Sequence, residues 1–255
     1  VDSTGQNRII VVSGANDKID AEKAASSLLE IGDLNVLIGQ FEIPMSVTQE
    51  VFSVAKNNGI TTIYNYAFQN TSSITSITIP NSVNTINHSA FSGMSSLVDI
   101  SLPFAGYNRT TTNQSQGLFG YVFGSAAYTG GTAVIQYSSS YTYYIPSTLR
   151  SITITDATVI NDYAFDNLGM ITSIELNEGI TLIDTYAFRD MTGITSLTIP
   201  NSVTTINSQT LHGTSSIVEI TIPFVGGTRT STLSSDLFGY IFGYTEYTGG
   251  TLVNQ

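Results

Sequence analysis

The sequence predicts a β-rich α/β solenoid built from coils of about 23 residues, with a small α/β cap at its N-terminal end. An Ala-Phe pair recurs, and each uninterrupted step between its phenylalanines is 23 residues, as from Phe68 to Phe91 or from Phe165 to Phe188. An Ile/Leu-x-x-Ile/Leu-x-Ile/Leu pattern begins at Ile74, Leu97, Leu149, Ile171, Ile194 and Ile217. On a longer scale, residues 60–103 match residues 180–223 at 24 of 44 positions. Because one such unit cannot bury both of its faces, several copies together indicate a stack.

Residues 1–58 differ in composition from the rest of the chain. Arg8–Val12 is typical of a strand, and Asp17–Glu30 has the apolar spacing and residue types of a helix. Ser46 and Gln49 resemble a capping box at the start of a second helix. We interpret this segment as the cap of the first coil; a small adhesive or linker domain that precedes the array is the alternative.

Two blocks of coils follow, over residues 59–103 and 149–223. In each coil, apolar and polar residues alternate, as in Ile77-Thr78-Ile79, and this pattern predicts a half-buried strand. The next residue, Pro80 in this coil, lacks an N–H and ends the pairing. The valine and isoleucine that follow turn inward, and the Ala-Phe pair is expected to fill the far side of the coil in a short turn.

Residues 104–148 interrupt the array. Phe119 lies 46 residues before Phe165, twice the repeat length, so its LFGYVFG motif is expected to occupy the Ala-Phe layer of one expanded coil. Thr132–Tyr137 and Tyr141–Ile145 alternate and predict a hairpin rich in tyrosine.

Residues 224–255 are a truncated copy of this insertion. The combined unit is therefore 120 residues long, and the second copy stops halfway. We expect the chain to be a natural fragment or a designed piece, and not a complete protein.

Composition excludes several functional classes. Only 11% of the residues are charged, against a typical ~25%. The net charge of −11 argues against binding to nucleic acid or anionic lipid, which both require clustered Lys and Arg. The chain has no Cys, which excludes disulfides and thiolate chemistry, and no apolar run approaches ~18 residues, so no membrane insertion is expected. A surface of hydroxyls and amides suits a secreted or cell-surface protein.

The motifs NSVNTINHSAF, GITLIDTYAF and NSVTTINSQTL, each flanked by Ile-x-Ile-Pro strands, resemble the BspA-type leucine-rich repeats of bacterial and protozoan surface proteins. The resemblance covers residues 60–255, although the family often has Cys after Ala-Phe and this chain does not. It implies a leucine-rich-repeat fold and an extracellular or cell-surface module for adhesion to host, matrix or other cell-surface proteins. Alternatives are a structural spacer within a larger surface protein and, least favoured, a glycan-binding or glycan-processing protein.

Two candidate binding surfaces follow from the pattern. The first is the solvent side of the strands, which a curved solenoid offers as a ligand platform; its residues are Ser76, Thr78, Asp99, Ser101, Ser151, Thr153, Ser173, Glu175, Ser196, Thr198, Glu219 and Thr221. The competing interpretation is a solvated strand face, because no aromatic or Arg anchor stands there. The second is the hairpin, with Tyr137, Tyr141, Tyr143 and Tyr144. These rings are expected either to contact a binding partner or to pack the insertion onto the solenoid.

No catalytic, cofactor or metal site is expected, because the chain has no G-x-S-x-G, H-E-x-x-H, P-loop or EF-hand pattern. His88 and His212 are interpreted as surface or turn residues. We therefore expect a non-enzymatic protein without cofactors whose partner is a host or matrix protein, or a glycan. The open coil edge near Gln255 is expected to fray or self-associate.

Overall fold

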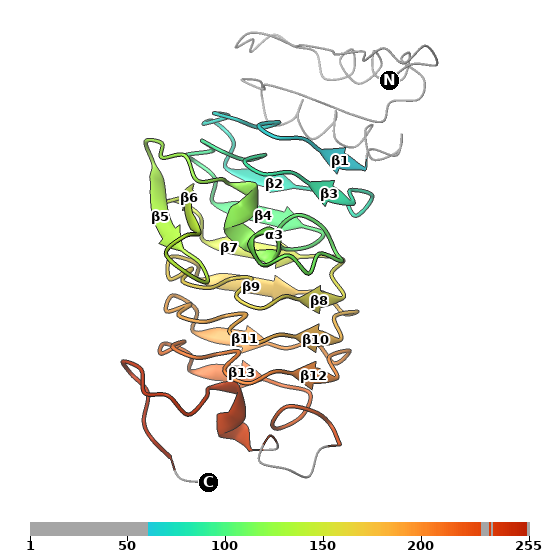
Figure 1. Cartoon of the computed structure of the whole chain (residues 1–255), viewed down its shortest axis with the longest axis vertical. Coiled ribbons are helices and arrows are strands. Elements are labelled where there is room, and N and C mark those ends of the chain that lie inside the picture. Colours follow the sequence, from blue (N-terminus) through green and yellow to red (C-terminus); the bar gives the residue numbers. More distant parts are fainter. Residues whose placement is uncertain (1–60, 231–234, 236, 254–255) are drawn as a thin grey trace.

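The computed structural model describes residues 61–230, 235 and 237–253. The predicted N-terminal cap, residues 1–58, lies outside the described residues. Figure 1 shows coils stacked along the long axis of the molecule, with strands running across it. The predicted solenoid is confirmed together with its repeat length, for example where Thr62 pairs with Thr85 and Leu182 with Thr205.

One strand of each coil joins a parallel sheet. Four strands pair in the order β2 (Ser76–Thr78), β4 (Asp99–Leu102), β7 (Ser151–Ile154) and β9 (Ser173–Leu176). The pair β11 (Ser196–Thr198) and β13 (Glu219–Thr221) lies next to β9 and extends the same face. Alternate residues such as Ile77 and Ile152 point into the core, because successive side chains of a strand face opposite sides.

Shorter parallel strands form the second side of each coil. They are β1 (Thr62–Ile63) with β3 (Thr85–Ile86), and β8 (Val159–Ile160) with β10 (Leu182–Ile183) and β12 (Thr205–Ile206). Both β3 and β12 follow a proline turn in which Val83 N–H, or its counterpart Val203, donates to the carbonyl of the proline. The prolines thus end one strand and redirect the chain toward the next.

The insertion is one expanded coil between β4 and β7. The chain passes through a short α-helix, α3 (Gln114–Gly117), and a 3₁₀ turn, η1 (Phe119–Val122). It then forms an antiparallel hairpin of β5 (Gly131–Ile135) and β6 (Thr142–Pro146), which lies along one side of the stack in Figure 1. The second LFG motif forms the matching turn η3 (Phe238–Ile241).

Arginine fastens the expanded coil to its neighbours. The Arg109 guanidinium pairs with Asp156 (Nη2–Oδ2 2.6 Å), donates to the carbonyls of Val83 and Asn81, and lies over the Phe104 ring. Arg229 repeats part of this arrangement in the second copy, donating to the Asn201 carbonyl and lying over Phe224.

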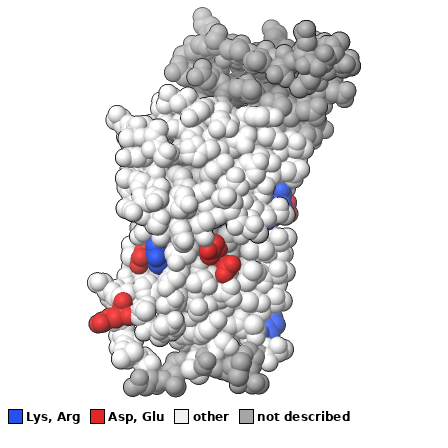
Figure 2. All heavy atoms as spheres, in the orientation of Figure 1, with Lys and Arg blue, Asp and Glu red and all other residues white. Residues whose placement is uncertain are grey.

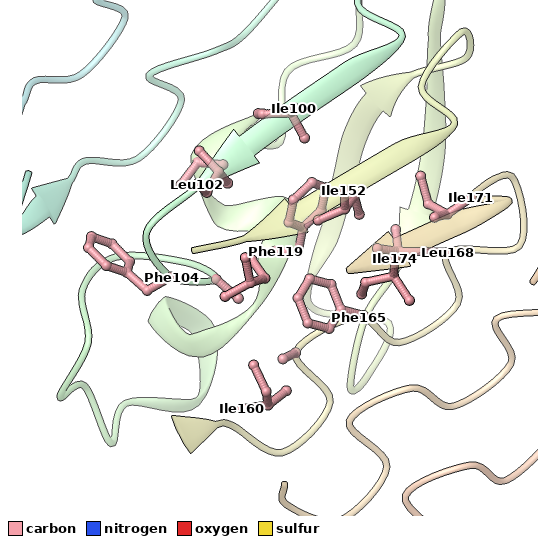
Figure 3. Close-up of a cluster of buried hydrophobic side chains, with 14 of the residues drawn as sticks. Ile100, Leu102, Phe104, Phe119, Ile152, Ile160, Phe165, Leu168, Ile171 and Ile174 are labelled. Carbon is pink, nitrogen blue, oxygen red and sulfur yellow. The ribbon is translucent and has the colours of Figure 1, made fainter. Parts of the chain in front are cut away.

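A ladder of phenylalanines fills the core. Ring centroids lie 5.4 Å apart for Phe68 and Phe91, 5.7 Å for Phe119 and Phe165, and 5.6 Å for Phe165 and Phe188. Backbone hydrogen bonds link the same layer: the Phe91 N–H donates to the Val122 carbonyl, and the Phe119 N–H donates to the Ala164 carbonyl. The LFGYVFG turn therefore occupies the Ala-Phe layer, and Figure 3 shows Phe119 and Phe165 in one cluster with the strand isoleucines.

The residue immediately before each Ala-Phe pair has a left-handed backbone, with φ between 55° and 61°. It is Tyr66, Ser89, Tyr163, Tyr186 or, before Leu211, Gln209. Non-glycine residues rarely adopt this conformation, which costs roughly 1–2 kcal/mol per residue. Because it recurs in successive coils, it belongs to the turn geometry of the repeat.

Candidate binding surfaces

The solvent side of the main sheet carries the twelve polar side chains that the pattern singled out; we call this surface the strand face. In register, Ser76, Asp99, Ser151 and Ser173 form one row. A second row contains Thr78, Ser101, Thr153 and Glu175. Ser101, Ser151 and Thr153 are half-buried and the other nine are exposed. None of the twelve side chains forms a hydrogen bond or ion pair with the described part of the chain.

Several polar side chains in the turns form hydrogen bonds to a neighbouring coil. Glu178 accepts hydrogen bonds from the backbone N–H groups of Asn201 and Ser202 at 3.1 and 3.0 Å, and these bonds hold the pKa of its carboxyl below the usual value. Asn207 Nδ2 donates to Asp184 Oδ1 at 2.6 Å. In contrast to Glu178 and Asp184, the polar groups of the strand face remain available to a ligand.

The three carboxylates of the strand face are spread out. Asp99, Glu175 and Glu219 lie on β4, β9 and β13, which are two strands apart in turn. A strand spacing of ~4.8 Å places neighbouring carboxylates on the order of 10–12 Å apart. Within the described residues, no three His, Cys, Asp or Glu side chains gather as metal ligands.

The hairpin tyrosines separate into two environments. Tyr143 is only 4% exposed, donates through its hydroxyl to the Ser115 carbonyl and lies against Gly120, where a Cβ would meet the ring at 2.4 Å. Burial, followed by the neighbouring Tyr141 and Tyr121, raises the pKa of Tyr143 to about 12. Tyr144 is half-buried, whereas Tyr137 is 42% exposed and contacts Tyr141.

A buried polar cluster attaches the hairpin to the next coils. The fully buried Gln136 accepts from Gly120 N–H and donates to the carbonyls of Ala164 and Asp166. The Asp166 carboxylate is also buried; it accepts from Tyr137 N–H at 2.8 Å and from Arg189 Nε and Nη2 at 2.7 and 2.6 Å. Desolvation raises the pKa of Asp166, and the bonds from Arg189 and Tyr137 partly offset that rise.

This attachment places Tyr137 at one end of a continuous row of rings that we call the tyrosine ridge. Its members are Tyr141, Tyr137, Tyr163, Tyr186, His212 and Tyr247, with successive ring centroids 4.9 to 5.9 Å apart. The Arg189 guanidinium lies 4.9 Å from the Tyr163 centroid and 5.3 Å from that of Tyr186. Sequence reasoning missed Tyr163 and Tyr186, although their recurrence before Ala-Phe at the repeat spacing was a visible signal.

The two histidines occupy separate places. His88 is half-buried, its Nδ1 lies 2.8 Å from the Ser89 hydroxyl, and its ring meets Tyr121 edge-on. Burial lowers the pKa of His88. His212 belongs to the tyrosine ridge, where its Nε2 lies 2.9 Å from the Thr245 hydroxyl.

Charge is sparse on the outside of the molecule. Figure 2 shows a few scattered acidic and basic side chains on an otherwise uncharged face. From residue 61 onward the sequence contains eleven acidic and four basic residues. In the part of the chain that the structure describes, no helix has the length and apolarity needed to cross a membrane.

The last described coil exposes residues that its duplicate covers. Leu118 and Phe119 are fully buried, whereas the equivalent Leu237 and Phe238 are each 40% exposed. The difference arises because the coil that contains Phe165 packs on the first copy, and no described coil packs in the same way on the second.

Comparison with known proteins identifies related sequences and structures. The model of the "BspA type Leucine rich repeat region" matches residues 46–118 and 135–242 in six copies. Similar solved structures include a leucine-rich repeat protein from Bacteroides ovatus (18% identity, 74% of this chain and 38% of that one, TM-score 0.42). Another is a leucine-rich cell surface protein from Faecalibacterium prausnitzii (18% identity, 64% of this chain and 43% of that one, TM-score 0.35).

A curated relative is a ribokinase from Schizosaccharomyces pombe, 33% identical over 67 residues. That match covers 26% of this chain and 21% of the ribokinase. This chain thus spans less than half the length of both solved structures and about a fifth of the ribokinase.

Proposed function

This chain belongs to the BspA-type leucine-rich-repeat family, and we propose that it is a non-enzymatic binding module, extracellular or at the cell surface, for host, matrix or other cell-surface proteins. The observation that carries this proposal is the strand face, whose twelve polar side chains form no bonds with the described part of the chain. These side chains are free to bond to a partner, whereas Glu178 and Asp184 in the turns are occupied by bonds between coils. The family membership supports the proposed location, because the resemblance to BspA-type repeats implies a surface module.

The spacing of the carboxylates favours binding over glycan hydrolysis. Glycoside hydrolases place two carboxyl groups about 5–5.5 Å apart, or about 6.5–9.5 Å apart with a water between them. The strand-face carboxylates lie on the order of 10–12 Å apart on an open sheet. Hydrolysis would also require a pocket that excludes water around the sugar, and the strand face is open to solvent.

Capture on an array tests the proposal. Purified collagen, laminin and fibronectin, together with defined oligosaccharides, are immobilised and probed with the full chain at micromolar concentration. We expect at least one protein spot to capture it. The variant Asp99→Asn/Glu175→Gln/Glu219→Gln should weaken capture by roughly tenfold, since a hydrogen bond to a charged group contributes about 1.5–3 kcal/mol.

Glu246→Gln serves as the matched control, because Glu246 is an exposed carboxylate outside the strand face. Equal effects of the control and the triple variant would remove the strand face as the site. A chain that no protein captures would instead be the structural spacer, which is the second candidate function.

A further inference from the structure

The tyrosine ridge has the anchors that the strand face lacks. Binding energy at protein interfaces concentrates in Trp, Tyr and Arg, whereas Ser and Thr contribute little. The strand face contains small hydroxyls and three carboxylates, whereas the ridge combines five tyrosines, one histidine and the adjacent Arg189. The ridge is therefore the better candidate for a tight contact.

The ridge tyrosines on the coils occupy a fixed point of the repeat turn. Tyr137, Tyr163 and Tyr186 have φ values of 65°, 55° and 57°, in the left-handed region. The same conformation occurs at the equivalent position of other coils, in Tyr66, Ser89 and Gln209, so it belongs to the turn geometry of the repeat. The repeat turn thus places a tyrosine at the same point of two successive coils, where the rings of Tyr163 and Tyr186 stack.

The arrangement of the rings limits the chemistry of the partner. Tyr163 and Tyr186 stack at 4.9 Å with 29° between their planes, and Arg189 lies over both. Their faces are thus largely covered, which disfavours ligands that stack on ring faces, such as sugars, bases or proline-rich segments.

The phenol hydroxyls, by contrast, are available. Those of Tyr137, Tyr163 and Tyr186 form no hydrogen bond with the described part of the chain, and none is a buried unpaired atom. A phenol hydroxyl is protonated at neutral pH and so can donate a hydrogen bond; burial raises the pKa of Tyr163 further. Tyrosine edges and hydroxyls of this kind form the contact surface of many protein-recognition sites, where rigid rings lose little entropy.

Charge adds a further requirement. The Arg189 charge is neutralised by the carboxylate of Asp166, and Asp190 lies 3.6 Å from Arg189 Nε. The ridge is therefore mildly acidic, on a chain whose described region has far more acidic than basic residues. A partner with complementary charge has a basic surface.

We infer that the tyrosine ridge is a second, anchoring interaction surface for a folded protein with a basic surface that accepts hydrogen bonds from the phenol hydroxyls. This inference rests on the proposed function and assigns it a site distinct from the strand face. Arg189 and Asp166 act as positioning residues, because their pairing also fixes Tyr137 against Tyr163.

The test removes the hydroxyls and keeps the rings. Tyr137→Phe/Tyr163→Phe/Tyr186→Phe is compared with wild type on collagen, laminin and fibronectin and on the oligosaccharides, with thermal unfolding measured in parallel. The matched control is Tyr64→Phe/Tyr66→Phe, two exposed tyrosines outside the ridge, of which Tyr66 has the same left-handed backbone. We expect the triple variant to bind a protein at least about tenfold more weakly with an unchanged melting temperature, and the control to bind like wild type.

Three results would overturn the inference. Unchanged protein binding by the triple variant, with loss only in the strand-face variant, leaves the proposed function standing and removes the ridge. Capture confined to oligosaccharides and dependent on the ridge assigns the surface to glycans. Failure of every protein to capture the wild-type chain removes both the ridge inference and the proposed function.

Discussion

The duplicated LFG turn permits an internal comparison of one substitution in two environments. Phe119 is fully buried between Phe123 and Phe165, whereas Phe238 is 40% exposed and has only Phe242 as a ring neighbour among the described residues. Phe119→Ala loses all of the free energy gained by transferring the phenyl ring from water to the core, leaves a cavity and removes two ring contacts. We expect it to lower the free energy of unfolding by about 3–5 kcal/mol. Phe238→Ala loses roughly 60% of this transfer free energy and leaves no closed cavity, so we expect the free energy of unfolding to fall by only about 1–2 kcal/mol.

Urea unfolding followed by far-UV circular dichroism provides the assay, supplemented by native-state hydrogen exchange because a solenoid can unfold in parts. The two variants should differ by about 2–3 kcal/mol. Protection should fall in the coil of Phe165 for Phe119→Ala and only near the C-terminal turn for Phe238→Ala. Equal costs for the two variants would contradict the assignment of Phe119 to a continuous core ladder.

Three further predictions concern the polar contacts between coils. Arg109→Lys should lower the melting temperature by about 2–8 °C, because lysine cannot reproduce the forked contacts of the guanidinium. The matched Arg229→Lys should have less effect, and equal shifts would contradict the role of Arg109 in joining the expanded coil to its neighbours. Asp166→Asn should cost about 2–4 kcal/mol in urea unfolding and expose the hairpin amides to exchange, since it removes the close carboxylate partner of Arg189 and leaves only the longer contact to Asp190. Unchanged amide protection would contradict the role of the Asp166–Arg189 pair in holding the hairpin. The pKa of Glu178 is lowered in the folded state. The stability that its carboxylate contributes is therefore present above the unfolded pKa of about 4.3 and is lost as the pH falls through the pKa of the folded state. Glu178→Gln should therefore flatten the decline in stability between about pH 5 and pH 3, and identical acid profiles would refute this.

The solenoid was predictable because its apolar spacing directly encodes burial. Isoleucines at alternating positions and phenylalanines at the repeat spacing specify which side chains face the core, and the structure buries them. The spacing of Phe119 from Phe165 likewise indicated that the LFG turn would enter the same layer. These relations depend on local periodicity, which a single sequence contains.

The tyrosine ridge depends on relations that periodicity does not contain. Tyr137 reaches Tyr163 only because Asp166 accepts its backbone N–H, and an aspartate at that position would ordinarily be expected in solvent. Alternation along β6 could have separated Tyr143 from Tyr144, since Tyr143 shares its inward face with Ile145. The place of His212 against Tyr186 follows from packing between coils and has no signal in the spacing.

The direct pairing of β4 with β7 has a consequence for how such a molecule can vary. Asp99 pairs with Ser151 across the whole insertion, in the same register that neighbouring strands reach across a single repeat. The extra chain leaves the stack and re-enters it without shifting the sheet. Evolution or engineering can therefore vary the exposed positions of the hairpin while the coils on either side keep their contacts. The buried residues Val134, Gln136, Tyr143 and Ile145 and the Phe119 turn must be retained.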